Sequence, residues 1–379
     1  MAGLSTAELV RLVQTVFRPL VEERSLAVLV DLPDAQVRDN PAWLERRALA
    51  ADWCQRLRDG GARAALDRVD LVAYRNVHRN NAELPLHAVV LRDLERVPSH
   101  VDELRDQPVP FDELLARYKM LIAPTELSAT APLKLAAKRL GFRAATMPGF
   151  SPAMLGALKL DYEEVTRRCE ALKTRLDAAS SARLACEAEG QLHELVLDLR
   201  HRTAFASGGR ITEPGTAGNL PSGETYIVPY EGEIRDDPSR SEGLLPLELG
   251  GEVFVYRISR NRAVEVLGTG PRAAVEREEL AREPAYSNVA ELGLGVLAGF
   301  GVRPVGEMLL DEKLGLHVAF GRSDHFGGAV GPADFTAPDR VIHIDRVYIP
   351  EVQPHVTVRA VDLINPDGND PLMRDGRYV

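Results

Sequence analysis

The sequence predicts two domains: an α/β N-terminal domain with a largely parallel sheet, and a mostly β (α+β) C-terminal domain. The chain has 379 residues, more than a single hydrophobic core usually supports. Helical segments and short apolar runs alternate up to about residue 180, which is typical of strands joined by helical crossovers. Beyond that point Gly and Pro become frequent and short β-type runs dominate. We therefore expect domains at 1–180 and 181–379.

The first domain opens with an amphipathic helix. Ser5 and Glu8 have the spacing of a capping box, and apolar residues from Leu9 to Phe17 recur at helical spacing. Further helices are predicted within 41–59, 131–141 and 161–180. The short apolar runs between them are expected to be strands: 26–32, 69–74, 86–91 and 119–124. This order favours a layered α/β domain.

The second domain is expected to consist mainly of strands. The β-type runs are "ETYIVP" at 224–229, "EVFVYRI" at 252–258 and "HVTVRAVDLI" at 355–364. One helix is predicted around "YSNVAELGLGVLAGF", 286–300. The Gly-rich stretches match neither a Walker loop nor a dinucleotide fingerprint, so no nucleotide cofactor is expected.

Composition excludes several classes of function. The 46 Lys and Arg against 56 Asp and Glu give a net charge of -10, which argues against a general nucleic-acid binder and against an anionic membrane surface. The three cysteines, Cys54, Cys169 and Cys186, have neither disulfide-type nor metal-type spacing. The N-terminus does not resemble a signal peptide, and no apolar run is long enough to span a membrane. A cytoplasmic protein is therefore expected.

The stretch "RVIHIDRVYIP", 340–350, places two polar side chains in a β-type run. Alternate residues of a strand leave the same face, so His343 and Asp345 would be neighbours on one surface. Burying an imidazole and a carboxylate is costly unless they pair with each other, with a metal ion or with a reacting group. Taken alone, this tripeptide favours a plain His/Asp pair, because H-x-D is a weak metal signal.

Other residues in the second half strengthen the metal interpretation. Three of the nine histidines, His317, His325 and His343, fall in one region, whereas the others lie in polar or helical contexts. Glu224 and Glu291 lie beside glycine or within an apolar run. The mixed set of nitrogen and oxygen donors suits a pair of divalent ions, an arrangement used in metal-assisted hydrolysis. Its members are Glu224, Glu291, His317, His343 and Asp345.

Four segments, in this order, resemble the metal-site blocks of the aminopeptidase T family, also called AmpS or thermophilic leucyl aminopeptidases. They are "GGRITEPGTAGNLPSGETYIVP", "NVAELGLGVL", "LDEKLGLHVAFG" and "HIDRVYI". The resemblance implies a two-domain homodimer in which a dinuclear site of Zn, Co or Mn type removes amino acids from peptide N-termini. It also implies that the five residues above are the metal ligands, with Glu224 and Glu291 taking part in catalysis.

The chain departs from the family pattern near the first histidine. Where the family has a tyrosine seven residues after that histidine, this chain has Asp324, followed by His325. Leu316 stands where threonine is usual, and the segment between His317 and His343 looks short. Asp324 and His325 are our candidates for moving a proton to the leaving amine.

Two other functions remain open. His317, His343 and Asp345 alone form a 2-His-1-carboxylate set, as in a mononuclear Fe(II) oxygenase, and the dihydroxypyridine ring-cleaving dioxygenases resemble aminopeptidase T in fold. A non-catalytic binding homologue is the other alternative. The residues "DEK" at 311–313 form either a solvated turn or a group that orients His317, and the turn is slightly favoured.

Overall fold

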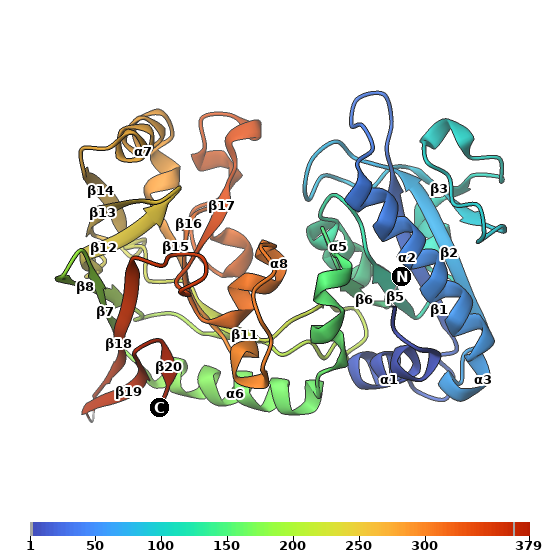
Figure 1. Ribbon diagram of the computed structural model, residues 1–379, viewed down its shortest axis with the longest axis horizontal. Helices are drawn as coiled ribbons and strands as arrows, with labels where there is room; N and C mark the ends of the chain where they lie inside the picture. Colours follow the sequence, from blue (N-terminus) through green and yellow to red (C-terminus); the bar gives the residue numbers. More distant parts are fainter. Residues whose placement is uncertain (1–2, 367) are drawn as a thin grey trace. The chain divides into compact units, whose positions relative to one another are not determined.

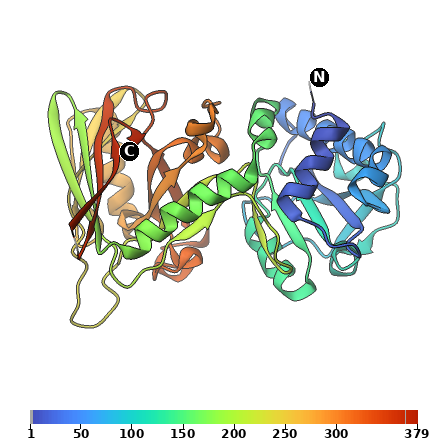
Figure 2. The ribbon, with the colours of Figure 1, turned by 90° about the horizontal axis from the view of Figure 1, so that it is seen from below.

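The computed structural model describes residues 3–366 and 368–379. It divides into two compact units, Met1–Thr166 with Gly209–Ser222 and Arg167–Gly208 with Gly223–Val379 (Figures 1 and 2). The division falls inside helix α6 (Tyr162–Ala178). The domain boundary expected near residue 180 stays a prediction.

The first unit is built on a seven-stranded sheet in the order β10-β6-β5-β1-β2-β3-β4. The pairs from β10 to β2 are parallel, and β3 and β4 are added antiparallel. Its strands are β1 (Ser25–Leu32), β2 (Arg68–Arg75), β3 (His87–Leu91), β4 (Val109–Pro110), β5 (Met120–Ala123), β6 (Arg143–Thr146) and β10 (Ala217–Asn219). The predicted α/β class with a largely parallel sheet is confirmed.

Local sequence explains these elements. The central strand β1 is buried along nearly its whole length, which is why its sequence is a continuous apolar run. The capping box of Ser5 and Glu8 starts the first helix, and Asn40 caps the second by accepting a hydrogen bond from the Trp43 backbone N–H. The helices of this unit are α1 (Thr6–Phe17), α2 (Pro41–Asp59), α3 (Gly61–Ala64), α4 (Phe111–Leu115) and α5 (Thr130–Leu140).

The second unit contains two antiparallel sheets. The five-stranded sheet has the order β17-β16-β15-β11-β9, and the eight-stranded sheet has the order β14-β13-β12-β8-β7-β18-β19-β20. The strands of the first are β9 (Phe205–Ser207), β11 (Glu224–Ile227), β15 (Val289–Gly295), β16 (Leu316–Gly321) and β17 (His343–Val347). Those of the second are β7 (Ser181–Ala188), β8 (Gln191–Asp198), β12 (Glu242–Leu249), β13 (Glu252–Ser259), β14 (Arg262–Leu267), β18 (Val356–Asn365), β19 (Gly368–Arg374) and β20 (Arg377–Tyr378). The helices are α7 (Pro271–Arg282) and α8 (Met308–Asp311).

Aromatic side chains join the two sheets of this unit. Tyr256 on β13 packs against Phe320 on β16, with ring centroids 5.1 Å apart. The Tyr348 hydroxyl, just after β17, donates a hydrogen bond to the Pro246 carbonyl on β12. The core of this unit therefore lies between the two sheets. The opposite face of the five-stranded sheet does not take part in these contacts.

The helix predicted at 286–300 is wrong. The structure has strand β15 there, between two short 3-10 segments. Every residue of this strand is buried, so its apolar run lacks the polar positions that separate a half-buried strand from a helix. Gly293 and Gly295 lower helix propensity, and neighbouring strands on both sides supply the backbone hydrogen bonds.

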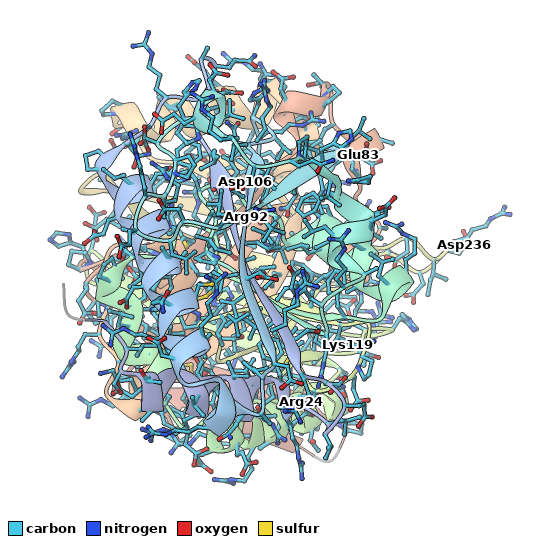
Figure 3. All side chains as sticks on the ribbon, turned by 90° about the vertical axis from the view of Figure 1, so that its right-hand side faces the viewer. Arg24, Glu83, Arg92, Asp106, Lys119 and Asp236 are labelled. Atoms are coloured by element: carbon cyan, nitrogen blue, oxygen red, sulfur yellow. The ribbon has the colours of Figure 1, made fainter. Side chains whose placement is uncertain are left out.

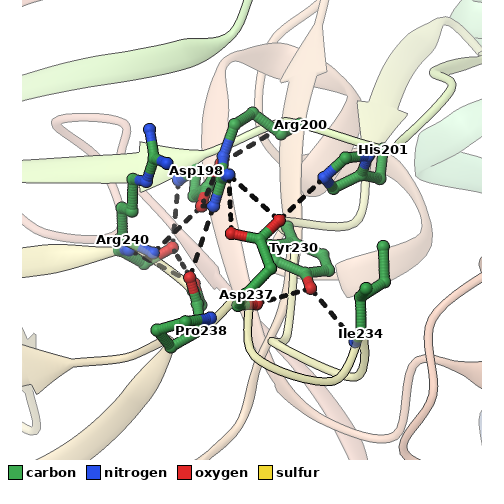
Figure 4. Close-up of polar contacts among 10 residues, drawn as sticks. Asp198, Arg200, His201, Tyr230, Ile234, Asp237, Pro238 and Arg240 are labelled. Atoms are coloured by element: carbon green, nitrogen blue, oxygen red, sulfur yellow. Dashed lines mark hydrogen bonds and ion pairs between the residues drawn. The ribbon is translucent and has the colours of Figure 1, made fainter.

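A polar network fixes the loop after β11 (Figure 4). Arg200 pairs with Asp198 and with Asp237, at 2.7 and 2.9 Å. The Tyr230 hydroxyl donates to the Asp237 carbonyl, and the Arg240 backbone N–H donates to Asp198. In the same loop the neighbouring Asp236 is solvated, with a side chain 90% exposed, as is that of Arg92 in the first unit (Figure 3).

All three cysteines are free and buried, and a buried thiol packs as a small apolar side chain. Among the residues described, no helix is long and apolar enough to cross a membrane.

Candidate metal centre

All five predicted ligands lie on one face of the five-stranded sheet. Opposite residues of an antiparallel pair share a face, and Glu291 pairs with Ala319, which pairs with Asp345. His317 lies two positions before Ala319 on β16, and His343 two positions before Asp345 on β17. Glu224 on β11 pairs with Gly295, which lies on the same face of β15 as Glu291. The predicted neighbourhood of His343 and Asp345 therefore extends across four strands, β11, β15, β16 and β17 (Figure 1).

Two glycines of β15 make room for these side chains. A Cβ atom on Gly293 would lie 1.8 Å from Nε2 of His317, so the imidazole lies across this glycine. A Cβ on Gly295 would lie 2.1 Å from the carbonyl carbon of Lys313, so the 313–315 backbone crosses the sheet there. The Glu-Leu-Gly-Leu-Gly pattern thus places a carboxylate beside two gaps on a single face.

The carboxylates and imidazoles form two overlapping groups. Nε2 of His317 is 3.1 Å from Oε1 of Glu291 and 3.6 Å from Oε2 of Glu224. Nε2 of His343 is 3.5 Å from Oε2 of Glu291 and 3.6 Å from Oδ1 of Asp345. In each trio, Glu224, Glu291 and His317, or Glu291, His343 and Asp345, one donor atom per residue lies within 4.8 Å of the others. Glu291 belongs to both trios.

The orientation of the histidines suits metal binding. Nδ1–H of His343 donates to the Arg322 carbonyl at 2.7 Å, and Nδ1 of His317 faces the Gly315 carbonyl at 3.4 Å. Both rings therefore direct Nε2 toward the carboxylates. A backbone carbonyl on one ring nitrogen is the usual way to leave the other nitrogen as a ligand.

Lys313, which the sequence analysis placed either in a solvated turn or in a group that orients His317, lies within this cluster. Its ammonium group is 2.5 Å from Oε1 of Glu224, also pairs with Glu312, and its side chain is only 1% exposed. Burial lowers the pKa of Lys313, but the two carboxylates outweigh burial and raise it, so the lysine is charged. Asp311 is also buried and accepts hydrogen bonds from the backbone of Val305 and Gly306.

The solvated turn favoured for 311–313 is therefore wrong. The apolar residues that follow, "LGLHVAF", indicated that this segment enters the core. The sequence could not show that a carboxylate from another strand, Glu224, compensates the buried ammonium group.

The charged groups of the cluster shift one another's pKa values. Burial lowers the pKa of His317, but the hydrogen bond and charge of Glu291, with the charges of Glu224 and Asp345, raise it to about 9. The pKa of His343 is also raised, by Asp345 and Glu291 against burial. Burial raises the pKa values of Glu291 and Asp345, whereas the histidines lower both. Without metal, the cluster therefore holds protons on imidazoles beside ionised carboxylates.

The donor set fits divalent ions of the Zn, Mn, Co or Fe kind. Buried carboxylates need compensating positive charge, which Lys313 and the protonated imidazoles supply in the metal-free cluster. Metal ions would supply that charge once the imidazoles are neutral. Imidazole nitrogen and carboxylate oxygen are the ligands that such ions share. The residues present are therefore suited to hold one or two ions.

Asp324 and His325 lie in a short 3-10 turn after β16. Asp324 pairs with Arg322 at 2.5 Å, which together with His325 lowers its pKa against burial. Neither metal trio found among the described residues includes Asp324. The ring of His325 is 5.4 Å from that of His343, and burial together with the charges of His343 and Arg322 lowers the pKa of His325 to about 4. The turn therefore brings a neutral imidazole beside a candidate ligand.

Glu231 holds this turn in place. It accepts hydrogen bonds from Oγ of Ser323 and Nδ2 of Asn288, at 2.5 and 2.6 Å, and from the Ala329 backbone. Because Asn288 immediately precedes β15, the turn is tied to the strand that carries Glu291. Glu231 was not among the site residues predicted from the sequence.

The fold and this cluster define a class: a two-unit α/β and β-rich protein with a carboxylate–histidine centre on an antiparallel sheet. Two solved structures are similar over their whole length. One is 2,5-dihydroxypyridine dioxygenase from Pseudomonas putida KT2440, with a TM-score of 0.60 and 16% identity over 99% of this chain and 98% of that chain. The other is wild-type AmpT from Thermus thermophilus, with a TM-score of 0.57 and 17% identity over 98% and 99%.

These similarities establish the fold. At such identities they do not separate a peptidase from a dioxygenase. A scan against protein-family models and a search of curated proteins found no match to the chain.

Proposed function

We propose that the protein is a metal-dependent aminopeptidase that uses two divalent ions, of Zn, Co or Mn type, to hydrolyse N-terminal residues from peptides. The observation that carries this proposal is the sharing of Glu291 by two ligand trios. A carboxylate with one oxygen toward His317 and the other toward His343 is suited to bridge two ions. The similarity to AmpT also supports a metal-dependent aminopeptidase.

Each residue has a separate task in this proposal. Glu224 with His317 would hold one ion, Asp345 with His343 the other, and Glu291 both. When bound, the ions supply a nucleophilic water and polarise the scissile carbonyl. Lys313 fixes the orientation of Glu224 and offsets its charge.

The remaining residues would handle the proton and the amine. The water oxygen bonds to the carbonyl carbon, the C–N bond breaks, and a proton passes to the leaving amine. His325, beside His343, is the candidate to carry this proton, and Asp324, paired with Arg322, is the candidate to orient it. The carboxylates are candidates to hold the free amine of the peptide.

A second function is favoured by one specific observation. Because Lys313 already compensates Glu224 at 2.5 Å, Glu224 need not bind metal. His317, His343 and Asp345 would then form a 2-His-1-carboxylate set for one Fe(II), which suits a ring-cleaving dioxygenase. The similarity to 2,5-dihydroxypyridine dioxygenase supports this alternative.

The metal content per chain distinguishes the two. Protein purified without chelator is analysed by plasma mass spectrometry, and about two ions of Zn, Co or Mn are expected per chain. Glu291→Gln should lose both ions, whereas Glu224→Gln and Asp345→Asn should each lose about one. Glu194→Gln, at a half-exposed carboxylate on β8, is the control and should lose none.

The opposite result would support the dioxygenase. About one Fe per chain, unaffected by Glu224→Gln and Glu291→Gln but lost in His343→Ala, would reject the dinuclear peptidase. Release of N-terminal residues from short peptides by the metal-loaded protein would then be absent.

A further inference from the structure

Three aromatic side chains form a cluster beside the candidate metal centre: Phe205, Tyr226 and Phe326, called here the aromatic cluster. The rings of Phe205 and Tyr226 are stacked, with centroids 5.6 Å apart, and Tyr226 meets Phe326 edge to face at 4.8 Å. Phe326 in turn meets the imidazole of His343 at 5.4 Å. The cluster therefore begins at a candidate ligand and runs away from it to the edge strand β9.

The sheet register explains this position. Tyr226 follows Glu224 by two residues on β11, so both leave the same face of the strand. Across the sheet, Tyr226 pairs with Phe205 on one side and with Gly293 on the other. Gly293 has no side chain, so nothing from β15 separates the tyrosine from His317, which lies over that glycine.

The cluster is not closed off as a core would be. Phe205 is 43% exposed on the edge strand of the sheet, where soluble proteins often place charged side chains. The hydroxyl of Tyr226 has no hydrogen-bond partner among the residues described, although the ring is largely covered. Exposed aromatic surface continuous with a buried polar centre is typical of a ligand site.

We propose that the aromatic cluster is the subsite for the side chain of the substrate's N-terminal residue, and that it selects peptides beginning with Phe, Tyr or Trp. This inference rests on the proposed aminopeptidase function. In such a substrate the side-chain-bearing Cα is bonded directly to the scissile carbonyl carbon. A carbonyl held beside His343 therefore directs that side chain to a surface next to the ligands, which Phe326 provides.

The chemistry of the cluster favours an aromatic side chain over others. Aromatic rings prefer offset-stacked or edge-to-face partners, and the exposed Phe205 offers such a partner. A charged side chain would lose its hydration against the apolar rings without gaining a partner. A small side chain such as that of alanine would cover little of this surface.

The first test is substrate preference in the metal-loaded protein. We compare kcat/KM for Phe-Ala and Ala-Ala dipeptides and expect a preference of about tenfold or more for Phe-Ala. Phe205→Ala should reduce that preference about fivefold, mainly through KM. Phe205→Leu, which keeps an apolar side chain and guards against loss of fold, should also reduce it. Leu192→Ala, at an exposed apolar residue of the eight-stranded sheet, should leave it unchanged.

The second test does not depend on catalysis. Binding of L-phenylalanine and L-alanine to the metal-loaded protein is measured by titration calorimetry. Tighter binding of L-phenylalanine, weakened in both Phe205 variants but not in Leu192→Ala, would support the aromatic subsite even if no peptide is hydrolysed. In that case the aminopeptidase function fails, and what stands is a binding site for an aromatic amino-acid side chain at the aromatic cluster.

Other results overturn the inference. Hydrolysis with equal kcat/KM for the two dipeptides, or with a preference unaffected by the Phe205 variants, would retain the aminopeptidase and reject the subsite. Binding of 2,5-dihydroxypyridine without binding of L-phenylalanine would reject both, because the rings would then serve a free aromatic substrate.

Discussion

At Gly293 a single added methyl group would occupy space that the imidazole of His317 fills. We expect Gly293→Ala to lower the free energy of unfolding by about 1–3 kcal/mol, because a close-packed site must shift to admit the methyl group. Metal content should fall as well, since the imidazole would turn away from Glu291. Urea unfolding followed by circular dichroism measures the first effect.

Gly156 provides the control for this variant. No atom lies within 4 Å of a Cβ added there, so Gly156→Ala should change stability by less than about 0.5 kcal/mol. Equal effects of the two variants would mean that the imidazole of His317 is not confined by Gly293.

Removing the hydroxyl of Tyr226 is expected to leave the stability of the protein nearly unchanged. The hydroxyl has no partner among the described residues, so Tyr226→Phe should change the free energy of unfolding by less than about 0.5 kcal/mol. Tyr256→Phe is the matched comparison, because that buried hydroxyl donates to Glu276 and its loss should cost about 1.5–3 kcal/mol. A large loss in Tyr226→Phe, measured by urea unfolding, would show that this hydroxyl has a structural partner.

Single residues show what a sequence can and cannot predict. The positions of His343 and Asp345 on one face followed from strand alternation alone. The burial of Lys313 did not, because it depends on Glu224, which lies 89 positions away in the chain. A lysine is expected to be exposed to solvent unless a partner for its charge can be identified.

At the level of elements, the strands β11, β15, β16 and β17 bring together groups whose pKa values depend on one another. In metal-free protein the pKa of His317 is raised from 6.5 to about 9. The folded state therefore binds this proton more tightly than the unfolded state does. The resulting stabilisation is fully present below pH 6.5 and is lost as the pH rises through 9.

We accordingly expect the titration of His317 alone to cost the metal-free protein about 3 kcal/mol of stability between pH 6.5 and 9. Urea unfolding with chelator at both pH values measures this loss. The fall should be smaller in His317→Asn. Part of it should remain, because Asp345 and Glu291 raise the pKa of His343 against burial, and burial raises that of Glu312. Stability that rises over this range would contradict the prediction. Metal affinity should increase over the same range, because metal binds neutral imidazole.

The prediction of elements was most reliable where periodicity and caps agreed, as in the helix opened by Ser5 and Glu8. The parallel strands of the first unit were also predicted, because each apolar run is short and lies between helical segments. It failed at β15, where an apolar run carries no period that separates a buried strand from a helix. That failure concerned the strand that carries Glu291, so the site's geometry could not be derived from the sequence.

At the scale of the whole molecule, every candidate ligand belongs to the second unit. A ligand that binds the folded state stabilises the part of the structure that holds it. With metal at about a thousand times its dissociation constant, amide exchange in β11, β15, β16 and β17 should slow by up to about a thousandfold relative to chelator-treated protein. Hydrogen exchange followed by mass spectrometry measures this directly.

The first unit is the internal control. Amides of β1 and β5 lie outside the unit that holds the candidate ligands, so their exchange should be unchanged by chelator. Equal slowing in both units would show that they open together or that metal binds elsewhere.

The path of the chain between the units has a consequence for the order of events during synthesis. Strand β10 completes the parallel sheet of the first unit beside β6, yet it lies within Gly209–Ser222, after the whole of Arg167–Gly208. A ribosome therefore releases α6, β7 and β8 before the first sheet can gain its last strand. Until then the edge of β6 has no partner strand on that side, so the nascent chain carries an open sheet edge. The first unit can reach its final form only after part of the second has already been made.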